Sequence, residues 1–109
     1  MNLEKSNAQM RKGVLELCVL SVISHKEVYT SDILSSLTEA ELLVVEGTVY
    51  PLLTRLKNER LLKYRWEEST SGPPRKYYSL TAEGHSAYEK MRNNWEKLNQ
   101  SVNRLLKKK

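Results

Sequence analysis

The C-terminal part of the chain carries a strict heptad pattern of apolar residues. From Ala82 onward there is no proline, and large apolar side chains fall at spacings of 3, 4, 3, 4 and 3. This alternation is typical of a coiled-coil interface rather than of the wider stripe of a helix that packs on its own domain. About 27 residues that rise about 1.5 Å each predict a helix of roughly 40 Å, longer than the body of a small domain. We therefore expect this helix to form a dimer interface through Tyr88, Met91, Trp95, Leu98, Val102 and Leu105.

The length of the chain and its few reactive side chains argue against an enzyme. It has 109 residues, which is room for one domain of ordinary size. The single cysteine, Cys18, cannot form an internal disulfide and lies in an apolar stretch, where burial is a more ordinary explanation than a reactive thiol. His25 and His85 stand alone, with no nucleophile motif around either. We expect no metal, no cofactor and no catalytic residue.

The sequence shows no sign of a membrane segment or an export signal. The N-terminus is polar, and the longest apolar runs are four residues. A span of the bilayer needs about 18 apolar residues. We expect no contact with a membrane and a cytoplasmic location.

Two helices are predicted in the first part of the chain. Residues 8–24 carry apolar side chains on more than one helical face, so this helix should lie at the centre of the core or under a partner. Thr30 or Ser31 can cap a second, short helix that ends at about residue 37 or 39. Residues 39–46 read as a connection that can hold a few extended residues.

A third helix is predicted over residues 48–59. Its apolar residues have the spacing i, i+3, i+4 and i+7 of one buried stripe. Pro51 is harmless only in a first turn, which puts the start of the helix at about Gly47 or Thr48. The opposite face then points outward with Thr48, Tyr50, Pro51, Thr54 and Arg55.

A β-hairpin is predicted next. Leu62, Tyr64 and Trp66 alternate with charged residues in a strict period of two. Residues 69–74 are rich in turn-forming residues, and residues 75–80 read as the returning strand, so the hairpin should have a long polar tip. Thr81 is placed to cap the last helix.

This order of elements predicts a mostly α winged helix-turn-helix with a two-stranded β-wing and a long C-terminal dimerisation helix. In this plan the second helix of the pair enters the major groove of double-stranded DNA, and the wing reaches the phosphates. We expect residues 1–80 to form the DNA-binding domain and residues 81–109 the dimerisation helix, together as one compact unit.

The predicted DNA contacts lie on two of these elements. Arg75 and Lys76, next to the hairpin tip, suit phosphates, although a merely solvated charged hairpin remains an alternative. Arg55 suits guanine, and Thr48 or Thr54 suits a thymine methyl group or a phosphate. Thr48 could instead cap its helix, and Tyr50 could equally be a core or interface aromatic. The full set of DNA-binding candidates is Ser31, Thr48, Tyr50, Thr54, Arg55, Arg75 and Lys76.

Several segments carry a family resemblance. Residues 46–56 (EGTVYPLLTRL) and 72–84 (GPPRKYYSLTAEG), supported by GVLEL at 13–17, LL at 61–62 and WEE at 66–68, resemble the shorter branch of the PadR family of bacterial transcriptional regulators. The resemblance implies a homodimeric repressor that pairs through its first and last helices and binds an inverted-repeat operator. It also implies release by a small phenolic or planar aromatic effector.

The chain departs from the family pattern at three places. Residues 29–33 read YTSDI where the family often has YGYEI, Val45 stands where Ser or Asn is common, and Arg60 replaces a glycine. Some short members of the family are said to hold flat ligands between paired tryptophans, which makes Trp95 a candidate ligand-binding residue. The simpler explanation, which we favour, is that Trp95 is a large core residue of the coiled coil.

The distribution of charge keeps a second function open. The net charge is +5, but residues 81–109 carry +4. Residues 31–61, which include the predicted recognition helix at 48–59, carry −2. Net charge therefore adds little support for DNA binding. The alternative is a winged-helix protein-interaction module that does not bind DNA.

Overall fold

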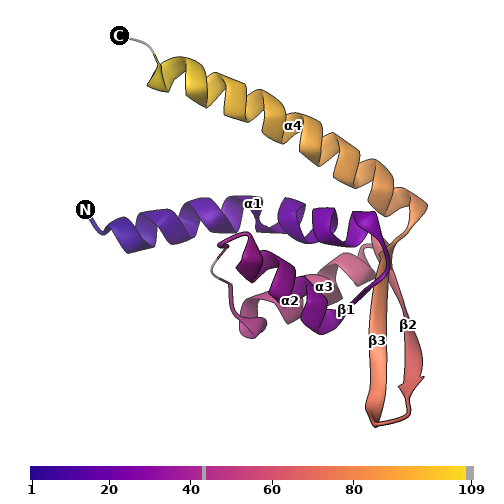
Figure 1. Ribbon diagram of the computed structural model, residues 1–109. Helices are drawn as coiled ribbons and strands as arrows, with labels where there is room; N and C mark the ends of the chain where they lie inside the picture. The colour runs from indigo at the N-terminus through magenta and orange to yellow at the C-terminus, as the bar shows by residue number, and fades with distance from the viewer. Residues whose placement is uncertain (43, 108–109) are drawn as a thin grey trace.

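The computed structural model describes residues 1–42 and 44–107, and it confirms the mostly helical winged helix-turn-helix (Figure 1). α1 lies between α4 on one side and α2 and α3 on the other, and the β2–β3 hairpin, called the wing below, projects away from α4. The elements are α1 (Leu3–His25), β1 (Val28–Tyr29), α2 (Thr30–Glu39), α3 (Glu46–Asn58), β2 (Leu62–Ser69), β3 (Gly72–Leu80) and α4 (Ala82–Leu106).

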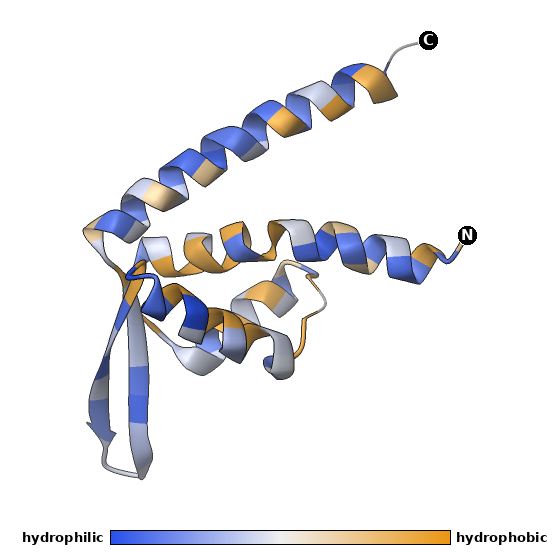
Figure 2. Ribbon diagram, turned by 180° about the vertical axis from the view of Figure 1, so that it is seen from behind, coloured by the Kyte–Doolittle hydropathy of each residue, from blue (hydrophilic) through white to orange (hydrophobic). Residues whose placement is uncertain are grey.

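α1 is the central helix, as its apolar faces predict. Its C-terminal half is hydrophobic and buries Leu15, Val19, Leu20 and Ile23, and it packs on α2, α4 and β3 (Figure 2). The helix begins at Leu3, earlier than the expected residue 8, because the Asn2 side chain caps it by accepting the backbone N–H of Lys5 at 3.0 Å.

The start of α2 differs from the prediction. Its N-cap is Tyr29 rather than Thr30 or Ser31, and the Asp32 carboxylate accepts the backbone N–H of Tyr29 at 3.3 Å. The Thr30 hydroxyl instead donates to the backbone carbonyl of Lys76 at 3.4 Å. The first turn of α2 is thereby joined to the wing.

A third strand extends the expected two-stranded wing. β1 pairs antiparallel with β3, with Val28 opposite Tyr78, and gives a sheet in the order β1-β3-β2. Two residues are too short for a period-two pattern, so the strand is not visible in the sequence. It is defined by its partner strand.

The wing tip is shorter than expected. β2 and β3 are joined through residues 70–71, with Ser69 opposite Gly72, so the prediction of a long polar tip is wrong. Pro73 and Pro74 lie inside β3, which tolerates them because β1 pairs only with Tyr77 and Tyr78 and leaves the tip half of β3 as an edge. The register of the hairpin also shifts between Glu67 and Ser69.

α3 begins at Glu46, so Pro51 lies in its second turn rather than in its first. The proline therefore removes one hydrogen bond inside the helix, to the carbonyl of Gly47. Gly47 is exposed, so water can reach its carbonyl group. No side chain caps the start of α3, where Val45 is the N-cap residue, and Thr48 is not its cap.

Both helices of the helix-turn-helix end in the same left-handed turn without a glycine. Glu41 after α2 has φ 63° and Arg60 after α3 has φ 65°. The backbone N–H of Leu42 reaches the Leu37 carbonyl at 2.9 Å, as in a Schellman motif. The backbone N–H of Leu61 likewise reaches the Leu56 carbonyl at 3.0 Å. Arg60 thus adopts the conformation that a glycine would take at this place.

α4 belongs to the core only at its start. Tyr88 is buried, and its hydroxyl lies 3.4 Å from the Ser21 hydroxyl of α1. Tyr88 therefore belongs to the core of its own chain, and its place in the dimer interface stays a prediction. Met91 is half-buried, and every later member of the heptad series is exposed: Trp95, Leu98, Val102 and Leu105.

The exposed part of α4 makes the chain elongated. Its Cα radius of gyration is 16.0 Å, against about 13 Å for a compact chain of this length. Figure 2 shows hydrophobic bands along an otherwise hydrophilic α4 that diverges from α1. Among the residues described, no helix is both long and apolar enough for a bilayer. Lys108 and Lys109 of the basic tail lie outside the described residues.

Candidate nucleic-acid interface

The outward face of α3 lies on the side of the molecule opposite α4 (Figure 1). The helix buries Val49, Leu53 and Leu56 and exposes the predicted candidates Tyr50 and Thr54. Tyr50 is 42% exposed, which argues against the alternative that it is a core aromatic. The Thr54 hydroxyl donates to the Tyr50 carbonyl at 3.2 Å, so its methyl group remains for apolar contact.

Arg55 is held by carboxylates of its own chain. Its guanidinium lies 3.2 Å from Glu16 of α1 and 3.0 Å from Glu59, and its side chain is 50% exposed. The bonds to Glu16, and the charge of Glu59, raise the pKa of Arg55. Arg55 must therefore exchange these partners before it can contact guanine.

Thr48 and Ser31 belong to the two different helices of the helix-turn-helix, α3 and α2. Thr48 lines an open groove of about 330 Å³ between α3 and α1, together with Arg11 and Lys12. Ser31 is exposed in the first turn of α2. The structure thus places Tyr50 and Thr54 on one surface, with Thr48 turned toward α1.

Arg75 and Lys76 lie on opposite faces of the wing. Successive strand residues point to opposite faces, and Lys76 pairs with Trp66 while Arg75 pairs with Glu67. The Lys76 ammonium lies 4.0 Å from the ring centre of Tyr64, and the Arg75 guanidinium lies 4.9 Å from that of Tyr29. The two cations are adjacent in sequence but do not share a face.

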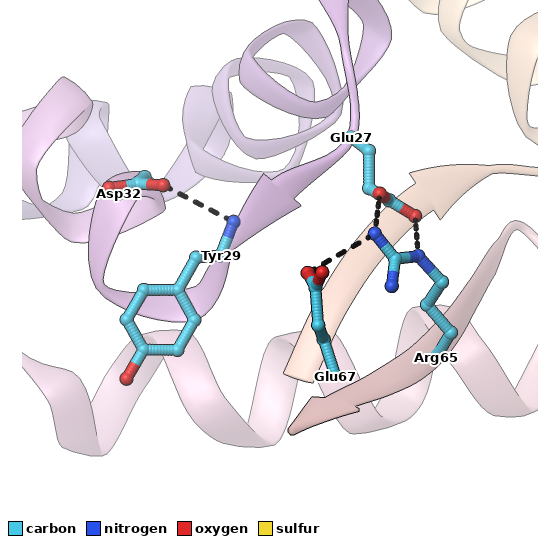
Figure 3. Close-up of polar contacts among 5 residues, drawn as sticks. All are labelled: Glu27, Tyr29, Asp32, Arg65 and Glu67. Atoms are coloured by element: carbon cyan, nitrogen blue, oxygen red, sulfur yellow. Dashed lines mark hydrogen bonds and ion pairs between the residues drawn. The ribbon is translucent and has the colours of Figure 1, made fainter. Parts of the chain in front are cut away.

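On the face of the wing that carries Arg75, an ion pair joins β2 to the connection between α1 and β1 (Figure 3). Arg65 donates two hydrogen bonds to Glu27, at 2.8 Å and 2.6 Å, and a longer one of 3.4 Å to Glu67. The hydrogen bond from Arg65 lowers the pKa of Glu27, and the same bond raises the pKa of Arg65. The positive charge of Arg65 is thereby compensated within the chain.

Lys57 is a residue that sequence reasoning missed. It is exposed in the last turn of α3, and its ammonium lies 5.7 Å from the ring centre of Tyr64 on β2. Its spacing from Tyr50 and Thr54 along the helix was the available signal, because residues seven and three apart share a face. Lys57 joins the outward face of α3 to the wing.

Trp95 lies between two apolar crevices on the other side of the molecule. One, of about 340 Å³, is lined by α1, α2 and α4 and includes Cys18 and Tyr88. The other, of about 260 Å³, lies between α1 and α4 and includes Val14 and Leu98. Cys18 is half-buried, and burial raises the pKa of its thiol, which disfavours the reactive thiolate. The described residues contain no cluster of side chains suited to a metal ion.

The chain is similar to known transcriptional regulators. Residues 19–90 match the transcriptional regulator PadR-like family. A PadR-like transcription factor from Bacteroides fragilis is 52% identical, covers 93% of this chain and 98% of its own, and has a TM-score of 0.77. A PadR-like transcriptional regulator from Bacillus cereus is 39% identical, covers 93% and 99%, and has a TM-score of 0.84.

A structure of Bacillus subtilis PadR in complex with operator DNA shares the fold. Its TM-score is 0.65 at 23% identity, and the match covers 72% of this chain but 46% of that protein. At this identity the likeness extends to the fold alone.

Proposed function

Because the chain belongs to the PadR-like family of transcriptional regulators, we propose that it binds operator DNA as a homodimeric repressor. The observation that carries this proposal is the exposed outward face of α3 beside the wing, on the side opposite α4. The DNA complex of Bacillus subtilis PadR, a protein of the same fold, supports it. Residues 1–80 would form the DNA-binding part and residues 81–109 the dimerisation helix.

In this function α3 enters the major groove. Tyr50 and Thr54 would contact base edges or methyl groups, and Arg55 would join them after releasing Glu16. Thr48 and Ser31 would contact the flanking backbone. Arg75 and Lys76 would reach phosphates from the two faces of the wing.

The dimer would form through the exposed part of α4. Leu98 is 57% exposed, and Trp95, Val102 and Leu105 continue the apolar series along the helix. An exposed apolar stripe of this kind supports the proposal that a partner chain covers it. Met91, half-buried in the chain, would lie at the start of the interface.

An effector site would lie at Trp95. The two crevices beside this side chain are lined mainly by apolar residues, which suits a planar aromatic or phenolic molecule. Binding there would move α4 against α1 and so change the spacing of the two α3 helices. Titration of tryptophan fluorescence with a panel of planar aromatic compounds tests this site, and a panel without response would remove it from the proposal.

Selection from random duplexes, followed by mobility-shift assays, tests DNA binding. We expect an inverted repeat whose half-sites lie about 34 Å apart, or a multiple of this distance, because each α3 would enter one major groove. Failure to retain any duplex, together with a protein partner in pull-down, would favour the protein-interaction module instead. The internal compensation of Arg55 by Glu16 and Glu59 is the observation that favours this second function.

A further inference from the structure

One face of the wing carries a row of aromatic rings that runs from the core toward the tip. Tyr78 is buried, its ring centre lies 5.9 Å from that of Tyr64, and Tyr64 lies 6.3 Å from Trp66 in an edge-to-face arrangement. Exposure rises along the row, from 38% for Tyr64 to 61% for Trp66. A row that begins in the core holds its exposed end in a fixed orientation.

Two lysines border this row. Lys57 of α3 and Lys76 of β3 each lie over the ring of Tyr64, at 5.7 Å and 4.0 Å from its centre. No ion pair among residues 1–42 and 44–107 includes either lysine. Two ammonium groups near one ring and without a paired carboxylate leave a site of positive potential that would attract an anion.

The opposite face of the wing has a different character. There Arg65 is paired with Glu27 and Glu67, and the nearby Lys63 contributes to the lowered pKa of Glu27. Along β2, Glu67 follows Trp66 and belongs to the opposite face, and Glu68 lies at the register shift between Glu67 and Ser69. The face that adjoins α3 thus carries two lysines beside exposed rings, whereas on the opposite face carboxylates lie among the cations.

We propose that Lys57, Tyr64, Trp66 and Lys76 form a second DNA-contact surface that binds the sugar–phosphate backbone beside the groove entered by α3. The two ammonium groups hold a phosphate, and the indole of Trp66 covers a deoxyribose. The inference rests on the proposed function. It adds Lys57, Tyr64 and Trp66 to the residues expected from the sequence.

Salt dependence of binding tests the two lysines. Affinity for a mixed-sequence 30-base-pair duplex and for a selected operator is measured against KCl concentration for the full chain and for Lys57→Gln, Lys76→Gln and Lys63→Gln. The slope of log K against log salt is negative, and each phosphate contact that is lost should reduce its magnitude by about 0.9. Lys63→Gln removes the same charge from the core end of the other face, where Lys63 lies opposite Ser79 and away from Arg75 near the tip, and should leave the slope unchanged. Lys76→Arg should keep the wild-type slope.

Fluorescence tests the contact of Trp66. The chain has two tryptophans, so the difference between the wild type and Trp66→Phe reports on Trp66 and leaves Trp95 in place. Saturation with the same duplex should protect Trp66 from acrylamide at least twofold and shift its emission to the blue. An unchanged quenching constant in a complex that forms would overturn the contact.

The outcomes separate the inference from the function on which it rests. If the wild-type chain binds no duplex even at low salt, the proposed function fails and the inference fails with it. If the chain binds and Lys63→Gln reduces the magnitude of the slope as much as Lys57→Gln and Lys76→Gln, DNA binding stands and the proposed face is wrong.

Discussion

Gly84, in the first turn of α4, lies directly against the backbone carbonyl of Leu61, at the connection between α3 and β2. The same carbonyl oxygen accepts the backbone N–H of Thr81 at 3.1 Å, and the Thr81 hydroxyl caps α4 by accepting the N–H of Gly84 at 2.9 Å. These contacts fix the place where α4 leaves the winged domain.

Replacement of Gly84 by alanine should therefore destabilise the fold. The added Cβ would overlap the Leu61 carbonyl oxygen and lie 3.0 Å from its carbon, and both atoms belong to the backbone. We expect the free energy of unfolding to fall by about 1–3 kcal/mol, measured by urea denaturation. Gly47→Ala is the control, because a Cβ there meets nothing within 4 Å. A Gly84→Ala chain as stable as the wild type would contradict the close contact.

Arg60→Gly should stabilise the chain. Arg60 adopts a φ of 65°, which costs a residue with a Cβ about 1–2 kcal/mol, while glycine adds about 0.4–1 kcal/mol of unfolded-state entropy. The expected net gain is about 0.5–1 kcal/mol in the free energy of unfolding. Ser35→Gly, in the interior of α2 and exposed, should have the opposite sign. Equal losses in both variants would show that Arg60 bears no strain.

Glu16→Gln should strengthen DNA binding if Arg55 contacts DNA. The substitution removes the carboxylate that lies 3.2 Å from the guanidinium, so less interaction energy is given up when Arg55 turns to the groove. A pair this exposed is worth about 0.2–1 kcal/mol, so the affinity should rise by about 1.4- to fivefold. In an Arg55→Met background the same change should have a smaller effect, which a double-mutant cycle measures. Equal effects in both backgrounds would show that Arg55 does not contact DNA and only links α3 to α1 through its ion pair with Glu16.

The Glu27–Arg65 pair should make stability depend on acid pH. Its hydrogen bonds lower the pKa of Glu27 below the ordinary value of 4.5, so the folded state binds a proton less readily than the unfolded state. The stabilisation is complete above the unfolded-state pKa and is lost as pH falls through the lower, folded-state pKa. At pH 7 the melting temperature of the wild type should exceed that of Glu27→Gln. This difference in melting temperature should close below about pH 4.5 and shrink in high salt. A difference that persists unchanged at acid pH would exclude the ion pair as its source.

Leu98→Glu should dissociate the dimer. Leu98 is exposed in the single chain and belongs to the apolar series of α4, so a carboxylate there would be buried without a partner. Sedimentation velocity should show monomers at concentrations where the wild type is dimeric. Gln100→Glu adds the same carboxylate to the side of α4 away from the series and should leave the dimer intact. Dissociation by both variants would point to charge rather than to the apolar interface.

Some features could be predicted from the sequence because they depend on neighbours within one or two helical turns. The buried stripe of Val49, Leu53 and Leu56 is a helical period. The capping of α4 by Thr81 depends on a bond to Gly84, three residues away. The exposed series that includes Leu98 follows the heptad spacing.

The remaining features were decided by tertiary structure, because their partners are distant in the chain. β1 exists through the pairing of Val28 with Tyr78, and Tyr88 is buried against α1, where its hydroxyl contacts that of Ser21. The charge of Arg55 is compensated by Glu16, on another helix. Local propensity and periodicity carry no information on such pairs, since each forms only when the fold has closed the intervening chain. The sequence by itself determined which helices this protein has, and the packing of those helices decided which of its charges remain available to DNA.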